Sequence, residues 1–138
     1  MTSQPPQGFE PLPSRSPFVN RAGTFYIRRD PDGGATVGTW IEHDQSNADG
    51  FAHGGFLLAF VDYTMTIVTM SITLSLSADF LRPARLGDWL EARINVRKRS
   101  ESLLFADAIV TGGGRDLMRV SGVLRPYSRN AREGRDVS

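Results

Sequence analysis

Residues 54–69 decide how this chain folds, and their sequence is GGFLLAFVDYTMTIVT. This is the only stretch of the sequence long enough for a substantial helix, which we expect from Gly54 to about Thr69. Apolar residues cover nearly the whole circumference of that helix, so we expect it to be buried. Its β-branched residues lower the intrinsic helix propensity, and tertiary packing must therefore hold the helix in place.

Strands are expected on both sides of the helix, because apolar and polar residues alternate there with a period of two. A turn at residues 30–34, DPDGG, separates the first two strands, and another at residues 111–114, TGGG, separates the last two. The expected strands are residues 23–29, 35–41, 72–80, 90–96, 103–110 and 118–125. One buried helix against a run of antiparallel strands predicts an α+β fold in which the sheet wraps around the helix.

The length and the composition predict one domain. The chain has 138 residues, of which 40% are hydrophobic, which is enough for one core. Five of the eight prolines lie within residues 1–17, so we expect this segment to be a flexible arm. The folded body is then residues 18–127, and residues 128–138 form a polar, charged tail.

Charge and residue usage exclude several classes of protein. Sixteen Lys and Arg against fifteen Asp and Glu give a net charge of +1, which argues against a nucleic-acid partner. The chain has no cysteine, and no apolar run approaches the roughly 20 residues of a membrane span. We therefore expect a cytoplasmic protein without a membrane partner. No metal site is expected, because the acidic and histidine residues of the loop before the helix lack the spacing of known metal motifs: His43, Asp44, Asp49 and His53.

The start of the helix has two adjacent glycines, Gly54 and Gly55. The first backbone N–H groups of a helix have no intrahelical acceptor and lie at the positive end of the helix dipole. Without side chains around them, these groups can bind a ligand oxygen that gains negative charge. The alternative is that the glycines only permit close packing.

Asp62 stands in the middle of the apolar helix, between Val61 and Tyr63. A charge in such a place is costly unless it is paired or used, and no cation lies within one helical turn of it in the sequence. A functional interpretation makes it a general base or a nucleophile. A structural interpretation makes it an aspartate that accepts hydrogen bonds from the backbone or from hydroxyl groups.

Several motifs together resemble the hotdog-fold acyl-CoA thioesterases of the phenylacetate-degradation type. They are Asn47, the run His53-Gly54-Gly55, Asp62, the strand from Thr73 that ends in Phe80-Leu81-Arg82-Pro83-Ala84, and the pair Gly87-Asp88. The resemblance covers roughly residues 18–126. It implies a long helix wrapped by an antiparallel sheet, a homodimer joined through that sheet, and often a dimer of dimers. It implies no cofactor, with coenzyme A present only as part of the substrate.

The same resemblance implies which residues form the site. Four would be catalytic: Gly54, Asn47, Asp62 and Thr73. The backbone of Gly54 would donate to the thioester carbonyl, and Asn47 would line the site. Asp62 would attack or activate water, and Thr73 would help to hold that water. Further contacts to the substrate would come from His53, which also fixes the loop, from Gly55 and from Arg82.

A cluster of three cations, Arg97, Lys98 and Arg99, follows the fourth expected strand. Such a cluster can hold the phosphates of coenzyme A through charge-assisted hydrogen bonds. The alternative is a solvated strand end. The connection from helix to strand, Met70-Ser71, is very short, whereas relatives often have a longer loop that shapes the acyl pocket. Whether the acyl group is aryl or medium-chain aliphatic is therefore left open.

The spacing of the helix residues predicts a site shared between two chains. Asp62 lies eight residues after Gly54, which is about 12 Å along a helix axis. An aspartate side chain cannot span that distance to a carbonyl held at the N–H of Gly54. A two-fold dimer with antiparallel helices would bring each Asp62 to the helix start of the other chain.

Two other functions fit the sequence less well than a thioesterase. An enoyl-CoA hydratase on this fold pairs an Asp and a His in a D-x-N-x-x-H loop, and neither Asp44 nor Asp49 begins such a pattern. A non-catalytic acyl-CoA-binding module would have no need of Asp62. The sequence therefore favours a thioester hydrolase with Asp62 and Gly54 at its centre.

Overall fold

The computed structural model of the chain describes residues 4–128. The long helix α2 covers Gly54–Thr69, which confirms the helix expected from the sequence. The elements before it are β1 (Glu10–Pro11), α1 (Pro17–Ala22), β2 (Phe25–Arg29), β3 (Ala35–Trp40) and the short 3-10 helix η1 (His43–Gln45). The elements after it are β4 (Ser71–Phe80), β5 (Trp89–Arg99), β6 (Leu104–Gly112) and β7 (Arg115–Pro126).

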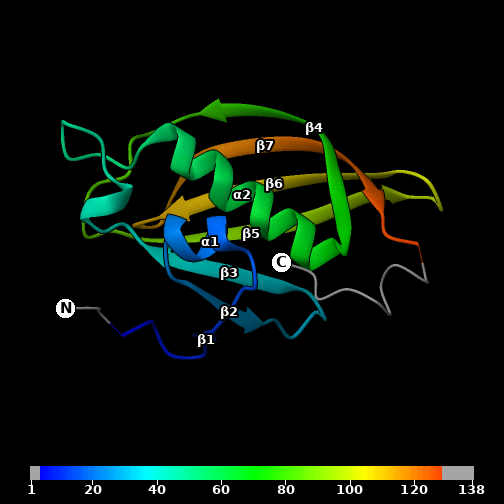
Figure 1. Cartoon of the computed structure of the whole chain (residues 1–138), viewed down its shortest axis with the longest axis horizontal. Helices are drawn as coiled ribbons and strands as arrows, with labels where there is room; N and C mark the ends of the chain where they lie inside the picture. The colour runs from blue at the N-terminus through cyan, green and yellow to red at the C-terminus, as the bar shows by residue number, and fades with distance from the viewer. Residues whose placement is uncertain (1–3, 129–138) are drawn as a thin grey trace.

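All seven strands form one antiparallel sheet in the order β1-β2-β3-β5-β6-β7-β4. The sheet curves around α2, which crosses its concave face (Figure 1). This is the α+β hotdog arrangement that the sequence predicts, and it has one strand, β1, and two short helices, α1 and η1, more than expected. Within the residues that the structure describes, no helix is long and apolar enough to cross a membrane.

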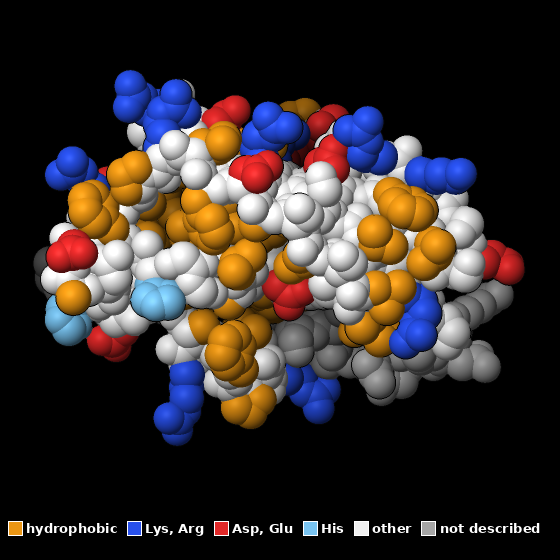
Figure 2. All heavy atoms as spheres, turned by 90° about the horizontal axis from the view of Figure 1, so that it is seen from above, with side chains coloured by type: hydrophobic (Ala, Val, Ile, Leu, Met, Phe, Trp, Pro, Cys, Tyr) orange, Lys and Arg blue, Asp and Glu red, His pale blue; other side chains and the backbone are white. Residues whose placement is uncertain are grey.

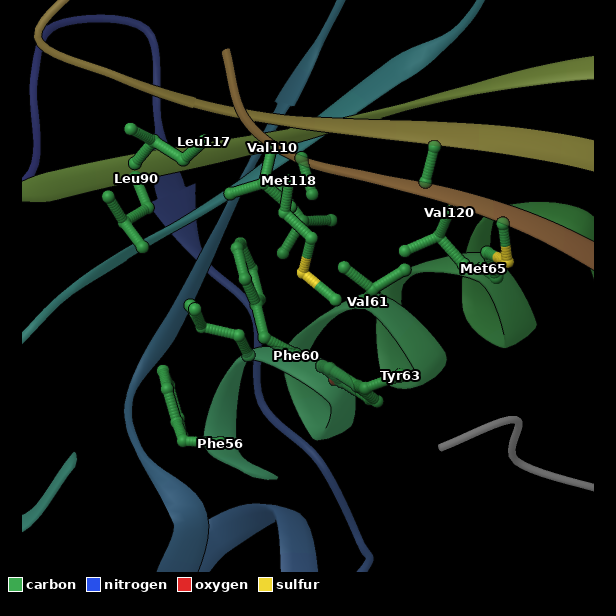
Figure 3. Packing of buried hydrophobic residues seen from close by; sticks show 14 of the residues in the cluster. Phe56, Phe60, Val61, Tyr63, Met65, Leu90, Val110, Leu117, Met118 and Val120 are labelled. Carbon is green, nitrogen blue, oxygen red and sulfur yellow. The ribbon is translucent and has the colours of Figure 1, made fainter. Parts of the chain in front are cut away.

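The core lies between α2 and the sheet. Phe60, Val61 and Met65 are fully buried on α2, and they point toward strand residues such as Val110 and Met118 (Figure 3). The β-branched positions of α2 are therefore held by packing, as expected from the sequence.

Residues 4–128 cover the opposite face of α2 only in part. Gly55 is exposed, and Ala59, Asp62 and Thr66 are half-buried. The expectation of a helix buried all round is wrong for this face, because the sheet covers α2 from one side only. The residues of this face recur at intervals of three and four, so they form one stripe along the helix.

The N-terminal segment differs most from its prediction. Phe9 is buried, and its ring packs edge-on against Trp89 at a centroid distance of 5.0 Å. The guanidinium of Arg28 lies over the Phe9 ring, 4.8 Å from its centroid. Because β1 also pairs with β2, residues 4–17 belong to the folded body rather than to a flexible arm. The predicted tail at residues 128–138 lies outside the described residues except for Ser128.

The junction between α2 and β4 consists of one residue. Met70 adopts a left-handed conformation with φ 55°, and its N–H donates to the carbonyl of Thr66. Residue Ser71 already begins β4. Strand β4 pairs only with β7 within residues 4–128 and so forms one edge of the sheet.

Candidate functional site

The loop that leads into α2 is fixed by its own polar groups. The side-chain oxygen of Asn47 accepts hydrogen bonds from the backbone N–H of Asp49 at 2.9 Å and of Phe51 at 3.1 Å. The N–H of His53 donates to the carbonyl of Gln45 at 2.8 Å. Asn47 therefore holds the shape of the loop through its oxygen, which leaves its amide nitrogen for another partner.

The loop delivers His53 to the N-cap of α2. Its Nδ1 accepts a hydrogen bond from the N–H of Gly55 at 2.9 Å, so this nitrogen carries no proton. The N–H of Gly54 has no acceptor among the described residues. The positive end of the helix dipole thus presents a free donor at Gly54.

The two glycines have different steric reasons to be glycine. A Cβ at Gly55 would lie 3.0 Å from Nδ1 of His53, which would displace the capping ring. A Cβ at Gly54 would meet only the ring of Phe80 at 3.6 Å, an ordinary contact. Packing therefore accounts for Gly55, whereas at Gly54 the fold tolerates a side chain.

Asp62 and Thr73 meet across the junction of helix and strand. The hydroxyl of Thr73 on β4 donates to Oδ1 of the Asp62 carboxylate at 2.5 Å. No other side chain in residues 4–128 pairs with this half-buried carboxylate. Thr73 thus fixes the orientation of the carboxylate and leaves its second oxygen free to accept from another group.

Tyr63, the next titratable residue on α2, faces the core. It is 5% exposed, and its ring lies 5.2 Å from that of Phe25. Burial raises the pKa of the Tyr63 phenol, so this group stays neutral at physiological pH. Asp62 is therefore the group on this part of α2 that can carry a charge or accept a proton.

Gly54 and Asp62 are not brought together within one chain. Both are on α2, and their separation of eight positions corresponds to about 12 Å along the axis. The structure thus contains two half-sites, a free donor at the helix start and an oriented carboxylate at its middle.

Arg82 follows the end of β4, two residues after Phe80, whose ring lies beside Gly54. Its guanidinium donates to the carbonyl of Asp116 at 2.9 Å, and its side chain is exposed. The guanidinium of Arg85 lies over the ring of Phe51 at 5.5 Å, and the two residues also form a backbone bridge. Sequence reasoning missed Phe51 and Arg85 as a pair next to the loop. The run of residues 80–85, FLRPAR, was the available signal.

The cation cluster lies at the other end of α2. Arg99 donates to the carbonyl of Thr69, the last helical residue, at 2.8 Å. Arg97 forms an ion pair with Asp107 at 2.6 Å. Lys98 is exposed and has no ion pair within the described part of the chain. Two of the three cations thus have protein partners, and Lys98 is available for another.

The region before α2 offers no arrangement of metal ligands. Across residues 4–128, no group of three or more His, Asp or Glu side chains could hold a metal ion. His43 and Asp44 contact each other at 3.4 Å, and both are exposed.

Comparison with known proteins identifies relatives along most of the chain. Residues 49–118, from the loop before α2 to β7, match the model of the Thioesterase superfamily. The chain is 35% identical over 126 residues to PA0474, a candidate esterase of Pseudomonas aeruginosa. That match covers 86% of this chain and 94% of the relative.

Solved structures share the fold. The TT0310 protein of Thermus thermophilus is 27% identical, with a TM-score of 0.73 over 83% of this chain and 100% of its own. A mutant of the phenylacetic acid degradation protein PaaI from the same organism is 26% identical. Its TM-score is 0.72, and the match covers 81% of this chain and 100% of that protein.

Proposed function

Because this chain belongs to the thioesterase superfamily and is a thioester hydrolase, we propose that it hydrolyses an aryl- or medium-chain acyl-CoA to the free acid and coenzyme A. The observation that carries the proposal is the free N–H of Gly54 at the start of α2, together with the oriented carboxylate of Asp62 on the same helix. Similarity to a phenylacetic acid degradation protein supports an aryl acyl group as one candidate substrate.

The chemistry follows from the two half-sites. The carbonyl oxygen of the thioester accepts a hydrogen bond from the N–H of Gly54, where the helix dipole stabilises the charge that develops on it. Asp62 of the partner subunit either takes a proton from the attacking water or attacks the carbonyl carbon directly. In the first case the bond from carbon to sulfur then breaks, and the thiolate takes the proton from Asp62 and leaves as the thiol of coenzyme A. In the second case the thiolate leaves with a proton from solvent, and water hydrolyses the mixed anhydride on Asp62 to the free acid. Thr73 holds the carboxylate through its Oδ1 and leaves the other oxygen for this step.

A second subunit is required to complete this site, and β4 supports a homodimer. Within residues 4–128 the strand pairs on one side only, and three large apolar side chains in or directly after it are exposed: Leu74, Phe80 and Leu81. Hydrophobic side chains gather on the face of the molecule seen from the β4 side (Figures 1 and 2). Because one residue joins α2 to β4, a two-fold axis at this edge would bring two α2 helices together as antiparallel neighbours. A dimer of two such dimers is the proposed larger assembly.

The remaining predicted residues are proposed as contacts to the substrate. His53 and Gly55 shape the helix start, and Asn47 lines it. Arg82 follows the strand that passes this start, and Lys98 is the cation of the cluster with Arg97 and Arg99 that has no ion pair within residues 4–128. The phosphates of coenzyme A would bind to these cations. The proposed enzyme needs no other cofactor and acts in the cytoplasm.

A thiol-release assay over a panel of acyl-CoA substrates tests the proposed function. The wild-type protein should release coenzyme A from aryl- or medium-chain acyl-CoA with turnover far above the rate without enzyme. An acyl-CoA that binds but is never hydrolysed would indicate a binding module instead, and water addition to an enoyl-CoA would indicate a hydratase.

Mixing two inactive variants tests the shared site. Gly54→Pro removes the donor and Asp62→Ala removes the carboxylate. Unfolded and refolded together in equal amounts, about half of the dimers should contain one chain of each kind. Each mixed dimer has one intact and one doubly damaged site, so activity should return to about a quarter of wild type. If mixed dimers are demonstrated by mass spectrometry and no activity returns, the site is not shared.

A further inference from the structure

A pocket lies between α1 and the first turns of α2. Its volume is about 390 Å³, within the range of sites that hold small molecules. The apolar lining comes from both helices: Phe18 and Ala22 of α1, and Phe56 and Ala59 of α2. Polar side chains also line the pocket, from Arg21 of α1 and from Asp44 and Ser46 before α2. The pocket also borders His53 and Gly55, which form the N-cap and the first turn of α2. It therefore begins at the turn that presents the free N–H of Gly54.

Helix α1 is held firmly enough to form a wall. Ser16 caps it by accepting from the N–H of Val19, and Pro17 occupies its first position, where no N–H is needed. At its other end, the side chain of Gln45 donates to the carbonyl of Ala22 at 2.9 Å. Val19 and Ala22 pack against the core. The position of α1 over α2 is thus fixed by capping and packing.

Phe18 is the unusual residue of this wall. Its side chain is 66% exposed, whereas Val19 and Ala22 on the same short helix pack inward. Phe18 contributes nothing to the core that would explain so large an apolar side chain here. It is placed to cover whatever enters the pocket.

The opposite wall is made of small residues. Gly55 and Ala59 are four positions apart on α2, so they lie on the same face of the helix. Asp62 and Thr66 continue this half-exposed stripe. The pocket is therefore open because two adjacent turns of α2 have small residues on this face.

We propose that this pocket receives the acyl group of the substrate, with Phe18 and Ala59 setting the length that fits. The proposal rests on the proposed hydrolysis of acyl-CoA and adds where the acyl group binds and which side chains limit its length. An acyl chain has no polar atom beyond its carbonyl and suits the apolar part of the lining, which comes from Phe18, Ala22, Phe56 and Ala59.

Hydrolysis of octanoyl-CoA and acetyl-CoA by two variants tests the pocket. Ala59→Phe fills it, and the ratio of kcat/KM for octanoyl-CoA to that for acetyl-CoA should fall at least tenfold. Phe18→Ala removes the cover, and the same ratio should fall about threefold to tenfold, without loss of folding because Phe18 is exposed. Phe105→Ala is the matched control, since Phe105 is an exposed phenylalanine on β6 outside the pocket, and it should leave the ratio unchanged. Equal losses for both substrates in both variants would overturn the proposal.

A binding measurement separates the pocket from the reaction. The wild-type protein should bind the thioether S-octyl-CoA at least tenfold more tightly than S-methyl-CoA in calorimetry, and Ala59→Phe should remove this preference. If the wild type shows the preference but hydrolyses no acyl-CoA, the pocket stands and the proposed function fails. If the wild type hydrolyses acyl-CoA but shows no preference for the octyl group, the function stands and the pocket is wrong.

Discussion

The two ends of α2 differ in how fully the rest of the chain satisfies their backbone hydrogen-bonding groups. At the C-terminal end, the N–H of Met70 donates to Thr66, Arg99 donates to the carbonyl of Thr69, and the N–H of Tyr127 donates to the carbonyl of Met70. At the N-terminal end, His53 satisfies the N–H of Gly55, and the N–H of Gly54 has no acceptor in residues 4–128. The C-terminal end of α2 is thus closed, in the sense that its backbone groups have protein partners, and the N-terminal end is open, in the sense that it keeps a free donor.

The difference between the two ends separates backbone groups that stabilise the fold from a backbone group that can bind a ligand. Unsatisfied backbone groups at a helix end are costly when buried, and this chain provides a side chain and backbone partners for the end that joins the sheet. An open donor at the exposed end costs little because water can bind it. It becomes useful when a ligand oxygen replaces that water.

The largest expected effect comes from the residue between the two ends. Asp62→Asn preserves the shape of the side chain and can still accept the hydrogen bond from Thr73. We expect kcat to fall by about 10² to 10⁴, the range for loss of a general base or nucleophile, with an unchanged melting temperature. A variant that melts far below wild type would show that Asp62 is structural.

Gly54→Pro tests the open end itself. Proline at the first helical position keeps the helix and removes the N–H, and the preceding His53 already has φ −65° and ψ 132°, which proline favours in its neighbour. Loss of one such donor should lower kcat by about 10² to 10³. Gly54→Ala is the matched control, because it adds a Cβ in ordinary contact with Phe80 and keeps the N–H. If both variants lose activity equally, the missing N–H of residue 54 is not the cause of the loss.

Arg99→Leu tests the closed end and should have the smallest effect on turnover. It removes a charged donor from the C-terminal carbonyl of α2 at Thr69, which should cost about 1 kcal/mol of unfolding free energy. The melting temperature should fall by about 3–5 °C, while kcat changes no more than a few-fold. A large loss of kcat with an unchanged melting temperature would show that the C-terminal end of α2 serves catalysis rather than stability.

Much of the fold could be predicted because its signals are local. The bounds of α2 at Gly54 and Thr69 follow from a mostly apolar run, interrupted by Asp62, that starts at two glycines and ends before the alternating residues of the next strand. The strands follow from the alternation of apolar and polar residues. The order of the strands in the sheet cannot be derived from that alternation, because the sequence of residues 71–80 does not indicate that this strand forms an edge.

The N-terminal segment could not be predicted for a physical reason. Prolines at residues 5, 6, 11 and 13 remove backbone donors and resemble a flexible linker. The segment is ordered because Phe9 finds an aromatic surface on Trp89, a partner 80 positions away in the sequence. Contacts of such separation leave no periodic signal.

The candidate site also has parts that the sequence predicts and parts that it does not. Asp62 and the glycine pair stand out locally, as a charge in an apolar helix and as flexible residues at its start. The bond from Thr73 to Asp62 joins two elements and was not predicted, since the resemblance implied only that Thr73 helps to hold the water. The roles of Arg97 and Arg99 depended on partners in β6 and α2 that the sequence does not reveal.

The single-residue junction at Met70 has a consequence for how this chain can evolve. Successive residues of β4 point to opposite faces, so one residue inserted between α2 and β4 would turn Leu76 and Ala78 away from the core and carry Thr73 away from Asp62. Two inserted residues would preserve the alternation, although they would shift the strand along β7. Substitutions at Met70 should therefore be tolerated far better than single insertions or deletions. The length of this junction, rather than the identity of its residue, is what selection must keep.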